Sequence, residues 1–252
     1  MTSLERVLLV VPALDEERSV GGIVDTGRRL GYDVCVVDDG SRDHTALLAA
    51  RAGASVLRLP VNLGVGGALR CGFRWALEHE YDVVVQVDAD GQHDPGQVEV
   101  LLDAMRETGA DMVIGSRFAA GAGSYKLSLA RRMAMRVLSA RVRRVARVRV
   151  LDSSSGFRAI RRPLLDRFAA DYPVEYLGDT VEALIEAGRA GAMIVERPIT
   201  MTQREHGSGT AGAIASLWYV LRVILAIELQ YKRRSVPLHD VPTDLSKSTA
   251  LG

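Results

Sequence analysis

A run of acidic and amide side chains follows a short apolar stretch near the middle of the chain. Residues 83–87 read VVVQV, a mostly β-branched pattern typical of a buried strand, and residues 88–94 then read DADGQHD. Carboxylates this close together repel one another unless water or a cation screens them. We interpret the segment as a site for a hard cation at the carboxyl end of a strand. A polar turn that binds nothing is the alternative.

The elements that would position this segment alternate along the first half of the chain. Strands are predicted over residues 6–11, 33–37, 55–58, 83–87 and 112–114, with helices over about 19–30, 42–52, 65–79 and 95–108. This alternation favours an α/β fold with a mostly parallel central sheet and crossover helices. Ligands of such sheets bind beyond the carboxyl ends of the strands. The residues that follow the strands are therefore expected to share one rim.

The rim residues of the first three strands suit a nucleotide. Leu14 can pack on a base, Glu16 and Asp38 can accept from ribose hydroxyls or base N–H groups, and Arg70, about two turns after a glycine, can reach a phosphate. For the turn after Asp38, helix capping by Ser41 is the alternative interpretation. The residues expected to contact the nucleotide are Pro12, Leu14, Glu16, Asp38, Asp39, Asn62, Gly64, Arg70 and Asp88.

Composition and the first turn exclude several classes. The 252 residues fit one large α/β domain or two small ones, the hydrophobic content of 48% allows a full core, and a net charge of +1 does not favour nucleic acid. Cys35 and Cys71 indicate neither a disulfide framework nor a zinc site. The first strand is followed by PALDEE and not by G-x-G-x-x-G, so a dinucleotide-binding domain is disfavoured. The start of the chain lacks a basic n-region, which predicts a cytoplasmic protein.

Six segments in order resemble one enzyme family. They are VPALDEERSV, VVDDGSRD, NLGVGGALRCGF, VDADGQHDP, GSRF and DSSSGFRAI, and the resemblance covers roughly residues 5–209. Their order and spacing are similar to those of the family 2 glycosyltransferases, and most similar to the polyprenyl-phosphate (dolichyl-phosphate) sugar synthases. The resemblance implies a GT-A fold, a nucleotide-sugar donor, Mg²⁺ or Mn²⁺ as cofactor, and inversion at the anomeric carbon.

The resemblance also implies roles for single residues. It assigns the metal to Asp88, Asp90 and Gln92, and it makes His93 a packing residue more readily than a ligand. Arg117 matches an arginine that faces the donor diphosphate or the acceptor phosphate; a surface arginine is the alternative.

The acceptor side is expected to follow in the second half. Arg131 matches an arginine aimed at the lipid phosphate, and Arg204 and Ser208 match a loop that closes over the donor diphosphate. Ser155 and Gly156 lie in a segment that we interpret as the acceptor wall. Asp179 matches the family's general base and is preferred to Glu182, the second candidate; helix capping is the alternative interpretation of Asp179.

Two segments, one basic and one apolar, favour binding of the protein to a membrane surface. Residues 131–149 contain eight arginines and no acidic residue, which suits anionic lipid headgroups. Residues 211–235 are mostly apolar but carry Arg222 at their centre, so we expect a helix in the membrane surface over a packed core helix or a span. The predicted organisation is a GT-A domain over 1–210, with a donor half (1–118) and an acceptor half (119–210), the interfacial helix, and a disordered tail over 236–252.

The sequence thus predicts a metal-dependent inverting glycosyltransferase that moves one sugar from a GDP- or UDP-linked donor to a polyprenyl phosphate. Its expected place is the inner face of the cell membrane, as a peripheral protein without a nucleic-acid partner. A transferase acting on a soluble hydroxyl acceptor and a non-catalytic nucleotide-sugar-binding protein are the alternatives. The donor sugar, the donor base and the oligomeric state stay open.

Overall fold

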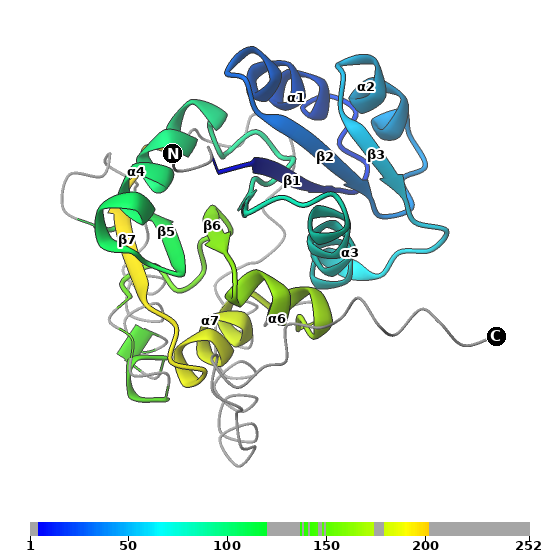
Figure 1. Ribbon diagram of the computed structural model, residues 1–252. Coiled ribbons are helices and arrows are strands. Elements are labelled where there is room, and N and C mark those ends of the chain that lie inside the picture. The colour runs from blue at the N-terminus through cyan, green and yellow to red at the C-terminus, as the bar shows by residue number, and fades with distance from the viewer. Residues whose placement is uncertain are drawn as a thin grey trace.

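The computed structural model describes residues 5–119, 137, 139–140, 142–145, 148, 150–173 and 179–201. In these residues a central sheet is flanked by helices on both faces (Figure 1). The elements are β1 (Val7–Ala13), α1 (Val20–Arg29), β2 (Asp33–Asp38), α2 (Thr45–Arg51), β3 (Ser55–Arg58), α3 (Gly64–Glu78), β4 (Val83–Gln86), the 3-10 helix η1 (Pro95–Gln97), α4 (Val98–Thr108), β5 (Met112–Ser116), β6 (Arg158–Arg161), α6 (Leu164–Ala170), α7 (Asp179–Arg189) and β7 (Ile194–Pro198).

The sheet has seven strands in the order β3-β2-β1-β4-β6-β5-β7. Its strands are parallel where β1 pairs with β2 and β4, where β2 pairs with β3, and where β5 pairs with β7. Only β6 runs the other way in this sheet, antiparallel to both β4 and β5. The prediction of an α/β fold with a mostly parallel central sheet is therefore confirmed.

The core lies in two layers because successive side chains of a strand point to opposite faces. In β1, Leu8 and Val10 pack with Phe73 and Phe168 on the face that α3, α6 and α7 cover. Leu9 and the other alternate residues of β1 pack on the opposite face, against α1, α2 and α4. A sheet that is apolar on both faces is typical of parallel α/β proteins.

The predicted elements of the donor half are found within one to three residues of their expected ends. Helix α6, by contrast, was missed: it follows Pro163 and buries Leu164, Leu165 and Phe168 against α3. In the described part of the chain, no helix combines the length and apolarity needed to cross a bilayer. The segments 211–235 and 236–252 lie outside the described residues, as do most residues of 131–149.

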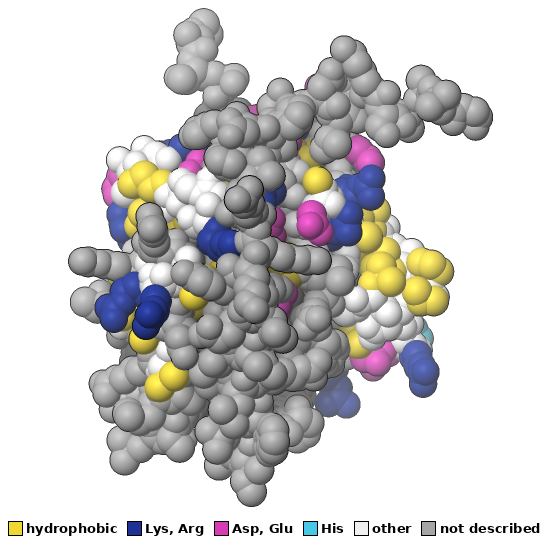
Figure 2. All heavy atoms as spheres, turned by 90° about the horizontal axis from the view of Figure 1, so that it is seen from below, with side chains coloured by type: hydrophobic (Ala, Val, Ile, Leu, Met, Phe, Trp, Pro, Cys, Tyr) yellow, Lys and Arg dark blue, Asp and Glu magenta, His cyan; other side chains and the backbone are white. Residues whose placement is uncertain are grey.

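The charged groups of the described surface are mixed in sign. On the face shown in Figure 2, the described arginine side chains lie in several separate places, and some have Asp or Glu side chains beside them. This distribution is consistent with the net charge of +1.

The direction of β6 decides what meets at the site. Because β6 is antiparallel to β4, its first residue, Arg158, pairs with the last residue of β4, Gln86. The segment that precedes β6 therefore arrives at the carboxyl end of β4, where residues 88–90 begin. In this way a segment of the second half of the chain comes to lie beside the acidic residues of the first half.

Candidate active site

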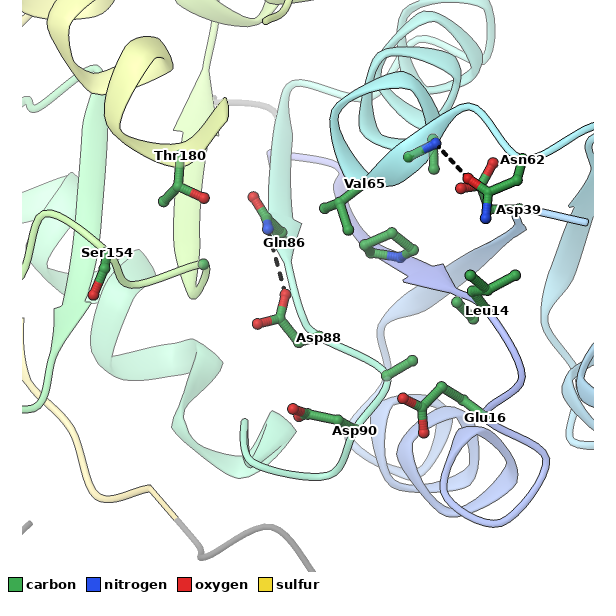
Figure 3. A pocket seen from close by; sticks show the side chains of 16 residues that line it. Leu14, Glu16, Asp39, Asn62, Val65, Gln86, Asp88, Asp90, Ser154 and Thr180 are labelled. Atoms are coloured by element: carbon green, nitrogen blue, oxygen red, sulfur yellow. Dashed lines mark hydrogen bonds between the residues drawn. The ribbon is translucent and has the colours of Figure 1, made fainter. Parts of the chain in front are cut away.

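A cleft of about 400 Å³ opens at the carboxyl ends of β1, β2 and β4. In Figure 3, Leu14, Asp39 and Asn62 lie on one side, Gln86, Asp88 and Asp90 in the middle, and Ser154 and Thr180 on the opposite side. The lining residues are Pro12, Ala13, Leu14, Glu16, Asp39, Asn62, Gly64, Val65, Ala68, Gln86, Asp88, Ala89, Asp90, Ser154, Gly156 and Thr180. The rim expected from the sequence thus exists as one concave surface.

The side of the cleft formed by β1 and α3 contains five of the residues expected to contact a nucleotide: Pro12, Leu14, Glu16, Asn62 and Gly64. The backbone N–H of Glu16 donates to Thr45 Oγ1 at 2.8 Å, and Ser19 Oγ donates to Glu16 Oε2 at 3.1 Å. These bonds fix the turn after β1. The Leu14 side chain is 39% exposed, which leaves an apolar surface for a flat ligand group beside polar acceptors.

The two aspartates at the end of β2 were both expected to contact the nucleotide, but only Asp39 lines the cleft. Asp39 lines the cleft, and its carboxylate accepts the Leu63 N–H at 2.7 Å. Burial raises the pKa of Asp39, and hydrogen bonds from the backbone of Leu63 and Gly64 oppose that shift. Asp38 is 2% exposed, accepts the Ser41 N–H at 3.0 Å, lies 3.6 Å from Arg58 Nε and is not a lining residue. Asp38 therefore shapes the turn, while Asp39 faces the ligand space.

Asp88 and Asp90 both turn toward the cleft just beyond β4. Asp90 Oδ1 accepts the Gln92 N–H at 3.0 Å, so Gln92 supports Asp90 through its backbone, and its side chain is not a lining group. His93 is 3% exposed and its ring packs on Phe157 with 5.1 Å between the ring centroids. The expectation that His93 is a packing residue agrees with this position.

The carboxylate pair fits a divalent cation that a substrate helps to bind. Among the described residues, no group of three or more His, Cys, Asp or Glu side chains is arranged to hold a metal ion. Mg²⁺ is commonly held by one or two carboxylates together with substrate phosphates and water. Asp88 and Asp90 meet that requirement because they lie in the same cleft as the nucleotide-side residues. They would hold the ion jointly with a diphosphate.

Arg117 lies at the end of β5 in a buried ion pair. Its Nε and Nη2 each lie 2.7 Å from an oxygen of Asp152, which is fully buried, and Nη2 also donates to Ser154 Oγ at 2.8 Å. Glu196 of β7 accepts the N–H groups of Leu151 and Asp152, each at 2.8 Å, and burial raises the pKa of Glu196. Arg117 is not a lining residue, but its partner Ser154 is. The sequence did not reveal this pairing.

The segment before β6, which we expected to form the acceptor wall, lines the cleft with Ser154 and not with Ser155. Ser155 is 2% exposed and its hydroxyl donates to the Gly115 carbonyl at 2.6 Å, so it joins the wall to β5. Ser154 and Gly156, on either side of it, line the cleft, together with Thr180 from the first turn of α7. Ser153 and Ser154 lie in a turn, across which the Ser155 N–H donates to the Asp152 carbonyl at 3.4 Å, so the alternation of an extended strand does not apply. The run of three serines therefore gives no sequence signal for the one that lines the cleft.

Arg70 is directed away from the cleft. Its guanidinium donates to the Ala170 carbonyl at the end of α6. Helical geometry explains the difference: at about 100° per residue, a position six residues after Gly64 is rotated by about 240°, whereas Ala68 returns to the side of Gly64 and lines the cleft. Arg70 joins α3 to α6 and does not reach the space where a phosphate would bind.

Three expected site residues, Arg131, Arg204 and Ser208, lie outside the described residues. Helix α7 begins at Asp179, whose side chain is also outside what the structure describes. Its neighbour Thr180 lines the cleft, so the start of α7 borders the site.

The chain belongs to the family described as glycosyl transferase family 2, which it matches over residues 8–168. The protein is therefore a glycosyltransferase with a GT-A-like fold. A solved structure of glucosyl-3-phosphoglycerate synthase from Mycobacterium tuberculosis, in complex with Mn²⁺, uridine diphosphate and glucosyl-3-phosphoglycerate, shares this fold. Its TM-score is 0.64 at 24% identity, with 92% of this chain and 81% of that chain covered.

Two curated relatives are similar over most of their length. The undecaprenyl-phosphate mannosyltransferase of Micrococcus luteus is 37% identical, with 80% of this chain and 86% of the relative covered. The polyprenol monophosphomannose synthase of Mycolicibacterium smegmatis is 32% identical, with 81% of this chain and 80% of the relative covered.

Proposed function

We propose that this glycosyltransferase moves a single sugar from a nucleotide sugar to a polyprenyl phosphate, with a divalent cation at Asp88 and Asp90. The observation that carries the proposal is one cleft in which this carboxylate pair lies between the nucleotide-side residues and the wall of Ser154 and Thr180. Mannose is the proposed sugar, because both named relatives are mannose transferases by name.

The residues of the cleft divide the work of the reaction. Leu14 and Asp39 hold the base and ribose of the donor, and Asp88 and Asp90 would hold the cation. When bound, the cation would supply a Lewis acid that neutralises the charge developing on the nucleoside diphosphate. The acceptor enters from the side of Ser154 and attacks the anomeric carbon from the face opposite the leaving group, so the configuration inverts.

A phosphate acceptor changes what the protein must supply. The second pKa of a phosphate monoester is about 6, so the acceptor is already a dianion near neutral pH and needs no general base. Asp179 would then orient the acceptor or the start of α7 and would not remove a proton. Because a polyprenyl phosphate resides in a membrane, we further propose that the protein works as a peripheral protein at the membrane surface, with residues 211–235 as the contact.

A transfer assay with matched acceptors tests the proposal. Purified full-length protein is incubated with labelled GDP-mannose, UDP-glucose or UDP-N-acetylglucosamine, with Mg²⁺ or Mn²⁺, and with either a polyprenyl phosphate or the corresponding polyprenol in detergent. We expect label in the lipid extract only with the phosphate and the cation, and most with GDP-mannose. Label on the free alcohol, or on water-soluble acceptors alone, would contradict the lipid-phosphate acceptor and require a general base.

A further inference from the structure

The Asp88 carboxylate lies against a glycine from the other half of the chain. A Cβ atom built on Gly156 would lie 2.9 Å from each carboxylate oxygen of Asp88 and 3.0 Å from Gln86 Nε2. The backbone of Gly156 is not in the left-handed region, so a larger residue is excluded by space and not by conformation. Because Gly156 has no side chain, the Asp88 carboxylate can lie in space that a Cβ atom would take, and an added Cβ would force the carboxylate to move.

A second contact fixes the backbone of Asp88. Its N–H donates to His93 Nδ1 at 3.0 Å, and because a backbone N–H can only donate, this ring nitrogen serves as the acceptor. The His93 ring also packs on the ring of Phe157, the residue after Gly156. The segment before β6 thus touches Asp88 directly through Gly156 and indirectly through Phe157 and His93.

A third contact comes from Gln86, the last residue of β4. Its side chain is buried, lines the cleft and donates from Nε2 to Asp88 Oδ1 at 3.4 Å. A buried amide within a run of valines is unexpected in a strand unless it serves a polar partner. Here the partner is the carboxylate at the mouth of the same strand.

We infer that Gln86, His93 and Gly156 are positioning residues that fix the orientation of the Asp88 carboxylate before the cation arrives. The inference rests on the proposed function, since it presupposes that Asp88 binds the cation. Gly27 and Gly72 are as tightly enclosed but face apolar side chains, Leu9 and Val34 for Gly27 and Val10 for Gly72, and Gly96 faces Asp94, which does not line the cleft. Gly156 instead meets a carboxylate that lines the cleft. Because Asp88 is one of the two carboxylates that we assign to the cation, its orientation should control metal affinity.

A glycine pair gives a matched test. Gly156→Ala is compared with Gly27→Ala, whose Cβ would meet side-chain atoms at similar distances of 2.9 and 3.0 Å, far from the cleft. For Gly156→Ala we expect the Mn²⁺ concentration at half-maximal transfer to rise by about tenfold or more. Calorimetry, independent of turnover, should show a weaker Mn²⁺-dependent gain in nucleoside diphosphate affinity and an unchanged affinity without metal. Gly27→Ala should lower the unfolding midpoint and leave the Mn²⁺ requirement unchanged.

The histidine supplies a second pair in case Gly156→Ala does not fold. His93→Phe keeps a ring against Phe157 but removes the acceptor, whereas His93→Asn places an amide oxygen near the position of Nδ1. We expect His93→Phe to raise the Mn²⁺ requirement and His93→Asn to restore it toward the wild-type value. Folded variants that all keep the wild-type Mn²⁺ requirement would overturn the inference alone. A wild-type enzyme whose transfer is indifferent to a chelator would overturn the metal role of Asp88, and the inference with it.

Discussion

Asp90 and Asp94 lie four residues apart in the acidic segment but face different surroundings. Asp90 lines the cleft, whereas Asp94 caps η1 by accepting the Gly96 N–H at 2.8 Å. Two aspartates of the same chemistry therefore have different positions: Asp90 lines the cleft as the proposed metal ligand, and Asp94 is a helix cap. The structure makes this distinction, which the residue types alone do not.

Asp90→Asn should abolish transfer while the protein stays folded. The amide keeps the side-chain acceptor for the Gln92 N–H but removes the negative charge that a divalent cation requires. Transfer at saturating Mg²⁺ and the thermal unfolding midpoint are the measurements. Asp94→Asn in the same loop is the control and should keep most of the activity. More than about a tenth of wild-type activity in Asp90→Asn would remove this carboxylate from the cation site.

Asp39→Asn should weaken nucleoside diphosphate binding by about 1–3 kcal/mol, the usual cost of a lost hydrogen bond to a charged group. Asp38→Asn should chiefly lower stability, because Asp38 bonds the Ser41 N–H and does not line the cleft. Calorimetry with GDP and UDP, together with denaturant unfolding, measures both effects. The opposite result, a larger affinity loss in Asp38→Asn, would return the ribose contact to Asp38.

A pH series adds an independent check on Asp39. Burial raises its pKa above the ordinary value for aspartate, so the carboxylate takes up its proton at a higher pH than an exposed aspartate does. Protonation removes an acceptor for ribose or base, and the affinity should fall as the pH falls through that raised pKa. The ligand phosphate titrates in the same way with both proteins, so its effect cancels in the ratio of the wild-type affinity to the Asp39→Asn affinity. This ratio should shrink toward one in acid, and a flat ratio would contradict the role.

The end of β5 and the segment before β6 are joined by Arg117 and Asp152. Removing one partner of a buried pair leaves an uncompensated charge and costs about 3–5 kcal/mol. Arg117→Ala should therefore lower the free energy of unfolding by about that amount, and Arg117→Ala with Asp152→Ala should cost clearly less than the sum of the single changes. Chemical denaturation of all three variants gives the coupling.

The exposed pair of Arg29 and Asp25 in α1 provides the control for this cycle. Its side chains are 69% and 64% exposed, so its coupling should be within about 1 kcal/mol. A coupling as weak between Arg117 and Asp152 would mean that the loop before β6 is held in some other way.

Elements of the donor half could be predicted because each carries its own periodic pattern. The same pattern placed Asp88 and Asp90 just beyond a strand, and their convergence on one cleft follows from parallel strands. Two predictions were wrong about which side chains face the cleft. Arg70 lies on a different side of α3 from Gly64 and contacts α6, and Ser155 bonds to β5 while its neighbour Ser154 lines the cleft. Contacts between distant segments, such as Arg117 with Asp152, leave no local pattern to detect.

At the scale of the whole molecule, the predicted division into halves crosses the sheet. Strand β6, from the second half, lies between β4 and β5 from the first half. A fragment ending at residue 118 would leave facing edges of β4 and β5 without their shared neighbour, and such open edges promote aggregation. We expect this fragment to lack the cooperative unfolding transition of the full chain in circular dichroism. A soluble, cooperatively unfolding fragment would show that the donor half is an independent unit.

The late arrival of β6 also has a consequence for synthesis on the ribosome. Asp88 emerges from the exit tunnel well before Gly156, which lies beside it in the finished protein, and before Phe157, which packs on His93. Before they emerge, the nascent chain already contains Leu14, Asp39, Asp88 and Asp90. The segment that packs beside Asp88 is still missing. A growing polypeptide should therefore acquire its affinity for divalent ions abruptly, once β6 is free to insert, and not gradually as each ligand is translated. Ribosome-bound chains stalled shortly before and after that point would differ in Mn²⁺ binding although they share every carboxylate of the cleft.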